Sequence, residues 1–136
     1  MTQQPNEYQF ELAIDVRDYE VDSQGIVNNA IYLHYMEHTR HEFCRAAGTS
    51  FRDMQADGLD PVLRKAEVEY LTPLRLGDRM ISKMNLVREG ARFIFVQDIF
   101  LEDGTPVARG LITCVCLDHG RLSRGDRMAA YFKKFI

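Results

Sequence analysis

Apolar and polar residues alternate strictly near the start of the chain, over residues 8–18. The apolar positions are Tyr8, Phe10, Leu12, Ile14 and Val16, and polar or charged residues lie between most of them. A period of two with one polar face predicts a half-buried β-strand.

From about residue 28 the apolar spacing becomes helical. The positions that share the helical spacing are Tyr32, Met36, Phe43 and Ala47, and Gly48 follows where a glycine commonly ends a helix. The pattern predicts a helix of about 20 residues, roughly 30 Å long. A short helical turn is expected after it, at residues 51–56.

The remainder of the chain is mostly strand-like. Strands are expected at 62–71, 79–88, 92–101 and 106–118, and an amphipathic segment at 126–135 closes the chain. Turn signals separate them, namely the Pro- and Gly-containing LTPLRLGD at 71–78, Glu89-Gly90 and Asp103-Gly104. The expected order is a strand, a long helix and about four strands in antiparallel succession, which is an α+β design. Because 92–101 is apolar on both faces and one helix cannot cover the whole sheet, we expect a second subunit to help cover it.

Composition and charge narrow the class of protein. The 136 residues are 46% hydrophobic and 27% charged, typical of one globular domain spanning 1–136. A net charge of −3 gives no reason to expect nucleic-acid binding. The opening MTQQPNEYQF lacks the features of a signal peptide, and no segment has the length of a membrane span. Three cysteines without a C-x-x-C pair argue against a disulfide framework or a zinc ribbon, so we expect a cytoplasmic protein.

Residues 22–38, DSQGIVNNAIYLHYMEH, contain two candidate sites. The first is His34-Tyr-Met-Glu37-His38, which fits the H-x-x-E-H zinc-peptidase pattern, and His41 shares its helix face. A metallopeptidase also needs a distant ligand and a cleft, for which this short chain has little room. So short a pattern also arises easily by chance in a helix rich in His and Glu. We therefore favour a solvated or subunit-contacting stripe and expect no metal.

The second candidate is the turn that precedes the helix. Asp22, Gly25, Ile-Val, two variable residues, Ala and Tyr32 together resemble the motif of the 4-hydroxybenzoyl-CoA thioesterase family, and LTPLRLGD resembles the same family's strand connection. The resemblance covers roughly residues 8–118. Within the family, the motif is most similar to plant and bacterial acyl-thioester hydrolases, including those that act on 1,4-dihydroxy-2-naphthoyl-CoA. The resemblance implies the hotdog fold, an antiparallel sheet wrapped around one long central helix.

The resemblance also implies roles for three residues. Asp22 would activate water or attack the thioester, the main-chain N–H of Asn29 would polarise the carbonyl, and Gly25 would let the backbone turn sharply. A helix N-terminus suits the negative charge that develops on a thioester oxygen. The structural alternative is that Asp22 only forms an Asx turn before a helix. Some relatives have a histidine where this chain has Asn29, so Asp22 would work without an imidazole partner.

Four further residues are candidates for substrate binding. Asn28 precedes the helix and is expected to cap it rather than to touch substrate. By its spacing Tyr32 belongs to the core, although the resemblance places it near the acyl pocket. Arg88 and Arg92 flank the Glu89-Gly90 turn, where arginines suit CoA phosphates; a solvated hairpin tip is the alternative. Cys114 and Cys116 are expected to be core thiols.

These features together predict an enzyme that hydrolyses acyl-CoA or acyl-carrier-protein thioesters without a cofactor, as a homodimer or homotetramer. One alternative is a non-catalytic acyl-CoA-binding module, which would not need the acid at position 22. The other is a hotdog dehydratase or hydratase, which would usually need a histidine paired with an acid. Outside the helix, His119 is the only histidine that the chain offers for that role.

Overall fold

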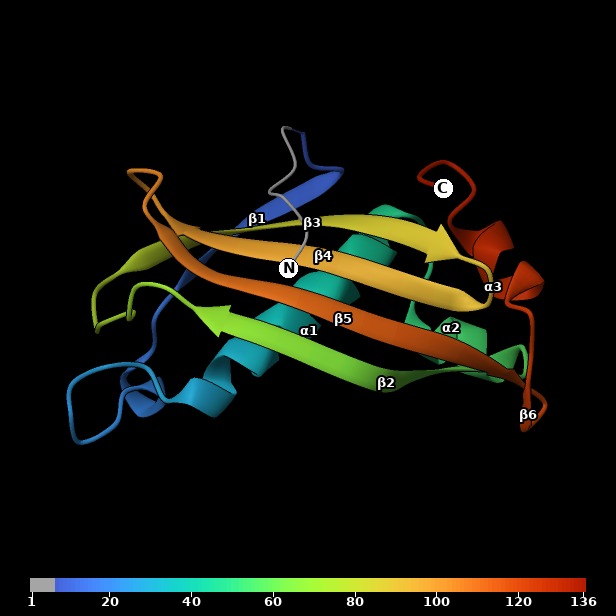
Figure 1. Cartoon of the computed structure of the whole chain (residues 1–136), viewed down its shortest axis with the longest axis horizontal. Helices are drawn as coiled ribbons and strands as arrows, with labels where there is room; N and C mark the ends of the chain where they lie inside the picture. Colours follow the sequence, from blue (N-terminus) through green and yellow to red (C-terminus); the bar gives the residue numbers. More distant parts are fainter. Residues whose placement is uncertain (1–6) are drawn as a thin grey trace.

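A computed structural model of the chain describes residues 7–136 (Figure 1). Residues 1–6, which carry most of the segment used to judge a signal peptide, lie outside the described part. The strands are β1 Phe10–Asp15, β2 Leu59–Tyr70, β3 Arg79–Glu89, β4 Arg92–Leu101, β5 Pro106–Asp118 and β6 Arg121–Leu122. The helices are the 3-10 turn η1 Asp18–Glu20, α1 Asn29–Ala46, α2 Phe51–Ala56 and α3 Asp126–Tyr131. The closing helix is shorter than the segment 126–135 predicted from the pattern.

The strands form one antiparallel sheet in the order β1-β3-β4-β5-β2, with β6 beside β5. The prediction of four strands in simple succession is therefore wrong for β2, which pairs with β5 at the edge of the sheet instead of with β3. Strands β3, β4 and β5 do follow one another through tight turns. The connection at 71–78 instead crosses the sheet from its β2 edge to β3. One edge of β2 is left without a neighbouring strand among the described residues (Figure 1).

Both ends of α1 have local causes. At the start, the side chain of Asn28 accepts a hydrogen bond of 2.9 Å from the N–H of Ala30 and so caps the helix, as predicted. At the other end, Gly48 adopts a φ of 84°, a left-handed conformation that costs glycine little. The helix therefore occupies nearly the length that the apolar spacing predicts.

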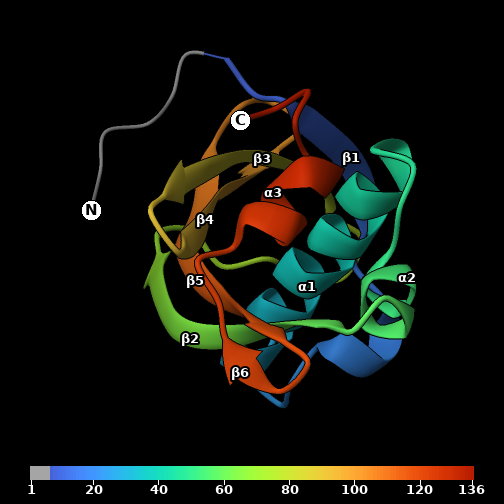
Figure 2. The same cartoon turned by 90° about the vertical axis from the view of Figure 1, so that its right-hand side faces the viewer.

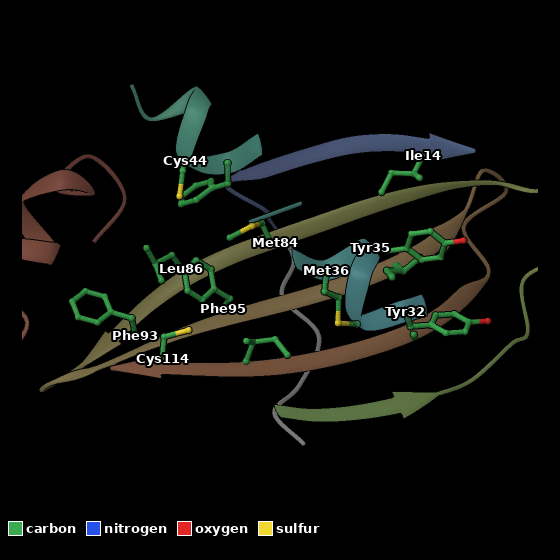
Figure 3. Packing of buried hydrophobic residues seen from close by; sticks show 14 of the residues in the cluster. Ile14, Tyr32, Tyr35, Met36, Cys44, Met84, Leu86, Phe93, Phe95 and Cys114 are labelled. Carbon is green, nitrogen blue, oxygen red and sulfur yellow. The ribbon is translucent and has the colours of Figure 1, made fainter. Parts of the chain in front are cut away.

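The sheet curves around α1, which lies in its concave face with α3 beside it (Figure 2). The core between them is formed by side chains such as Met36 from α1 and Phe95 and Cys114 from the strands (Figure 3). Gly110 leaves room for Met36, because a Cβ at that position would lie 2.6 Å from the methionine sulfur. The helix thus packs directly against the middle of β5.

Strand β4 is buried on both faces, in agreement with its apolar pattern. On the α1 side, the Gln97 amide donates a hydrogen bond of 2.9 Å to the carbonyl of Met36. On the opposite face, Asp98 accepts a bond of 2.8 Å from the Tyr8 hydroxyl and lies 3.4 Å from the Arg109 guanidinium. Burial raises the pKa of the Asp98 carboxyl, while these two partners oppose that rise. The predicted α+β hotdog arrangement is confirmed.

Candidate active site

The segment that links η1 to α1 is a closed loop. Val21 and Val27 form an antiparallel bridge, and the N–H of Asp22 donates to the carbonyl of Ile26 at 2.8 Å. Gly25 sits at the tip with a φ of 82°, and its N–H donates to the carbonyl of Asp22 at 3.0 Å. A side chain at this φ would be strained, so glycine allows the sharp turn.

The carboxylate of Asp22 is partly exposed and takes part in this loop. Its Oδ1 accepts a hydrogen bond of 2.8 Å from the N–H of Gln24, which is the Asx turn that the structural alternative expects. One oxygen is thereby oriented, while Oδ2 has no hydrogen-bond partner among residues 7–136. The turn therefore holds the carboxyl group in place while one of its oxygens stays without a hydrogen bond from these residues.

The loop is anchored to a part of the chain some fifty residues away. The N–H of Val27 donates to the carbonyl of Leu74 at 2.8 Å, and Ile26 bridges Arg75. The N–H of Leu74 in turn donates to the hydroxyl of Tyr32 at 2.9 Å. The two motifs noted in the sequence, 22–32 and 71–78, are therefore one structural unit. Tyr32 is buried in the core, as its spacing predicts.

The start of α1 follows this loop directly. Asn29 is the first helical residue, so its N–H has no acceptor within the helix. Its carbonyl accepts a hydrogen bond of 3.0 Å from the Tyr70 hydroxyl at the end of β2. Asp22, Gly25, Asn28, Asn29 and Tyr32 are thus brought together at one end of the molecule.

Sequence patterns gave no sign of a buried carboxylate beside the loop. Glu20 is 6% exposed, and its side chain accepts bonds of 2.8 Å from both the Arg17 N–H and the Tyr35 hydroxyl. Its carbonyl accepts from the N–H of Asn28 at 3.1 Å. Burial is the main cause of the raised Tyr35 pKa, and the bond to Glu20 adds to it. Glu20 therefore holds the segment that leads into α1 in place relative to the helix.

Arg88 and Arg92 lie elsewhere. The β3–β4 turn is at the opposite end of the sheet from the start of α1 (Figure 1). Arg88 donates to the carbonyls of Gly90 and Arg124 and pairs with Asp126 at 2.7 Å, so it ties the turn to α3. Arg92 is exposed and borders a groove of about 400 Å³ on the convex face of the sheet. Within one chain neither arginine reaches Asp22.

The histidines do not gather into a site. His34, His38 and His41 are exposed on α1, and His41 lies 3.7 Å from Glu37. The part of the chain that the structure describes contains no group of three His, Cys, Asp or Glu side chains placed to hold a metal ion. His119 pairs with Asp118 at 2.7 Å at the end of β5, away from the Asp22 loop.

The three cysteines are buried, as expected for the pair in β5. Burial raises the pKa of the Cys44 thiol to about 12, and it also raises the pKa of Cys114. The thiols are thus protonated near neutral pH and lack the reactivity of a thiolate.

Comparisons with known proteins agree with this geometry. A family model described as the thioesterase-like superfamily matches residues 16–134. The chain is 34% identical over 111 residues to the Arabidopsis thaliana protein named acyl-acyl carrier protein thioesterase ATL3, covering 80% of this chain and 58% of that protein. It is 36% identical over 107 residues to the Escherichia coli protein named long-chain acyl-CoA thioesterase FadM, covering 77% and 80% of the two chains. The chain thus spans less than two thirds of the length of its Arabidopsis relatives.

Solved structures resemble the fold closely. An Aquifex aeolicus protein titled hypothetical protein AQ1494 has a TM-score of 0.83 at 31% identity, covering 89% of this chain and 96% of that one. The Escherichia coli probable thioesterase YbaW has a TM-score of 0.82 at 29% identity, with coverages of 93% and 98%. The curved sheet around one helix, with an acid-bearing loop at the helix start, defines a hotdog-fold protein. The chain belongs to the thioesterase-like superfamily.

Proposed function

We propose that this protein hydrolyses acyl thioesters at the start of α1. The observation that carries the proposal is the closed loop at 22–27, which leads into α1. Among residues 7–136, Oδ2 of Asp22 has no hydrogen-bond partner, and neither has the N–H of Asn29 at the start of the helix. The names of the relatives, which include acyl-CoA and acyl-carrier-protein thioesterases, support the same reaction.

In the proposed mechanism the thioester oxygen binds the N–H of Asn29, at the positive end of the α1 dipole. Asp22 either takes a proton from water as the water oxygen attacks the acyl carbon, or attacks that carbon itself. The developing oxyanion is stabilised by the helix N–H, and loss of such a donor typically costs about 3–4 kcal/mol of barrier. Collapse of the tetrahedral intermediate breaks the carbon–sulfur bond. In the general-base route the thiolate receives the proton that Asp22 took from water, which gives a free acid and a thiol. In the nucleophilic route collapse leaves an anhydride between the acyl group and Asp22, and water then hydrolyses it, which releases the acid, restores Asp22 and supplies the proton of the thiol.

The Asn29 side chain has no proton to shuttle near neutral pH. Proton transfer therefore rests on Asp22 alone, and no cofactor enters the proposed reaction. Gly25 contributes through the backbone, because the sharp turn brings the carboxyl group to the helix start. Asn28 is proposed to hold the first turn of α1 in place, and Tyr32 to hold the loop through Leu74.

The proposed substrate is carried by CoA or by an acyl carrier protein. Both carriers present phosphate, which suits a cationic surface. The groove beside Arg92 offers one, because Arg64 and Lys65 line it as well, although Lys65 also pairs with Glu67 at 2.8 Å. Arg88 is proposed to support this end of the molecule through its bonds to α3 rather than to bind phosphate itself.

The protein is proposed to act as a homodimer, alone or as half of a homotetramer. The free edge of β2 exposes the backbone groups that point away from β5, and such an edge readily pairs with a second strand. Large apolar side chains are exposed on and beside it, namely Val62, Leu63, Tyr70, Leu71 and Leu33 of α1. Antiparallel pairing of β2 with its copy would cover these groups and join the two sheets. A cytoplasmic location is part of the same proposal; within residues 7–136 no helix has the length and apolarity to cross a membrane.

The experiment that tests the reaction is a thiol-release assay on aliphatic and aromatic acyl-CoAs, with and without a chelator. We expect chelator-resistant hydrolysis that falls at least about 100-fold in Asp22→Asn, as for loss of a positioned acid–base group. Asp18→Asn, which removes an exposed carboxylate four residues away, serves as the control. Undiminished turnover in Asp22→Asn would remove Asp22 from the chemistry. Tight acyl-CoA binding without thiol release would favour the binding module instead.

A further inference from the structure

A second pocket lies between the middle of α1, α2 and the free edge of the sheet. Its volume is about 310 Å³. The residues that line it are Glu37, Arg40, His41, Phe51, Pro61, Leu63 and Cys114. Most of its wall is apolar, and the one permanent positive charge in it belongs to Arg40. None of these residues has a role in the Asp22 loop of the same chain.

Arg40 is held in a fixed place. Its Nη1 donates to the side-chain oxygen of Gln97 at 2.9 Å, and its guanidinium carbon lies 5.8 Å from the centre of the Phe95 ring. The Gln97 amide nitrogen is itself bonded to the carbonyl of Met36, so the glutamine cannot turn away. The guanidinium is therefore oriented before any ligand arrives.

Arg40 also lacks a counterion within ion-pair distance, although the charge of Glu37 in the same pocket acts on it from further away. Among residues 7–136 no carboxylate lies within ion-pair distance of its guanidinium, and Glu37 approaches His41 instead at 3.7 Å. The side chain of Arg40 lines the pocket, and within the described residues Nη1 is the nitrogen of its guanidinium that has a hydrogen-bond partner. Burial lowers the pKa of Arg40 because it disfavours the charged form. A partly desolvated cation without a counterion favours an anionic ligand.

The position of the pocket along β2 relates it to the site in a second subunit. Pro61 and Leu63 lie toward the Leu59 end of β2, whereas Tyr70, at the other end, contacts Asn29. When an edge strand pairs antiparallel with its own copy, opposite ends of the two strands lie side by side. The Asp22 end of one subunit then lies beside the pocket of its partner. In Figure 1 the loop before α1 lies at the end of the sheet that carries the arrowhead of β2.

We propose that Arg40 of one subunit binds a negatively charged or hydrogen-bond-accepting oxygen on the acyl group of the substrate. The thioester of the same substrate is held at the Asp22 end of the other subunit. This inference rests on the proposed thioesterase function and homodimer. The favoured substrates are then thioesters of short dicarboxylic acids, and the apolar walls contributed by Phe51 and Leu63 pack against the carbon skeleton. Arginine suits such oxygens because it offers several donors in a planar fork.

Matched pairs of CoA thioesters test the proposed specificity. Succinyl-CoA is compared with butyryl-CoA, and glutaryl-CoA with valeryl-CoA, so that the carrier stays constant. We expect kcat/KM for the oxygen-bearing member to fall by about tenfold or more in Arg40→Gln, since a site built for a polar group discriminates strongly. The apolar member should keep its kcat/KM, and Arg40→Lys should lie between. Arg45→Gln, an exposed arginine one turn further along α1, is the control.

Two results would overturn the assignment. An equal loss for both members of each pair would mean that Arg40 contacts the carrier or only supports the fold. A wild-type preference for the apolar members would exclude the proposed substrate class. Absence of hydrolysis of these four and of the whole aliphatic and aromatic panel above would instead refute the proposed function. Calorimetric binding of the same pairs to wild type and Arg40→Gln then decides the pocket, with equal affinities overturning it.

Mixing subunits tests the placement across the interface. Asp22→Asn and Arg40→Gln proteins are unfolded together, refolded and assayed on the preferred oxygen-bearing substrate. If the site combines Asp22 of one subunit with Arg40 of the other, random pairing gives about a quarter of the wild-type activity. About half of the dimers then contain one subunit of each kind, and each such dimer has one intact site out of two. Activity no greater than the mean of the two parents would place both residues in the same subunit's site and overturn the proposal.

Discussion

The hydroxyl of Tyr35 donates a hydrogen bond of 2.8 Å to the carboxylate of Glu20, and both side chains are almost fully buried. The contact joins the second turn of α1 to the segment that enters the Asp22 loop. Because the carbonyl of Glu20 also accepts the N–H of Asn28, the pair fixes the helix start relative to the loop. The geometry of the candidate site thus depends on a contact outside it.

Replacement of Tyr35 by phenylalanine should lower the free energy of unfolding by about 1.5–3 kcal/mol, the usual range for a hydrogen bond to a charged group. The midpoint of urea unfolding, followed by circular dichroism, measures the loss. Tyr19→Phe is the matched control, because Tyr19 is 80% exposed and its change should be close to zero. Equal midpoints for Tyr35→Phe and wild type would show that the buried bond does not contribute.

Tyr70→Phe should affect catalysis more than stability. Tyr70 is 48% exposed, so little packing is lost, but its hydroxyl holds the carbonyl of Asn29 at 3.0 Å. Without that bond the first turn of α1, which carries the N–H proposed to bind the oxyanion, is less well oriented. We expect kcat to fall roughly tenfold, equivalent to about 1.4 kcal/mol of barrier, with little change in KM. Steady-state thiol release measures both constants, and an unchanged kcat would separate Tyr70 from the reaction.

Alkaline pH should destabilise the protein through its buried thiols. The Cys44 thiol has its pKa raised by burial from 9.0 to about 12, so between these values the unfolded chain has lost a proton that the folded chain retains. The contribution of the buried Cys44 thiol to the free energy of unfolding is therefore fully present below about pH 9. It falls as the pH rises toward 12, by up to about 1.4 kcal/mol per pH unit for one thiol. Urea unfolding at a series of pH values in this range measures the slope. Cys44→Ala should show a shallower slope, and parallel curves would contradict the prediction.

Local patterns predicted most of the elements. The bounds of β5 agree with the predicted 106–118, and Asn28 and Gly48 marked the ends of α1 because caps are set by neighbouring residues. The position of β2 beside β5 was missed, because strand order depends on pairing between distant segments. The bond from Tyr70 to Asn29 could not be predicted for the same reason.

The candidate site was predicted only where it follows a local motif. Asp22, Gly25 and Asn29 were identified because they are close together in the sequence and resemble a family motif. Glu20 and Arg40 were not, because burial and the lack of a counterion are properties of the folded chain. Arg88 was chosen for its type and place at a turn, and the structure shows its donors already engaged with α3.

The anchoring of the Asp22 loop to Leu74 has a consequence for synthesis on the ribosome. Residues 22–46 emerge first, but the groups that hold the loop, the carbonyl of Leu74 and the backbone of Arg75, are made only after β2 is complete. A nascent chain that has exposed α1 alone therefore lacks the partners that give the loop its shape. The site should form late during translation, after Leu74 has left the exit tunnel.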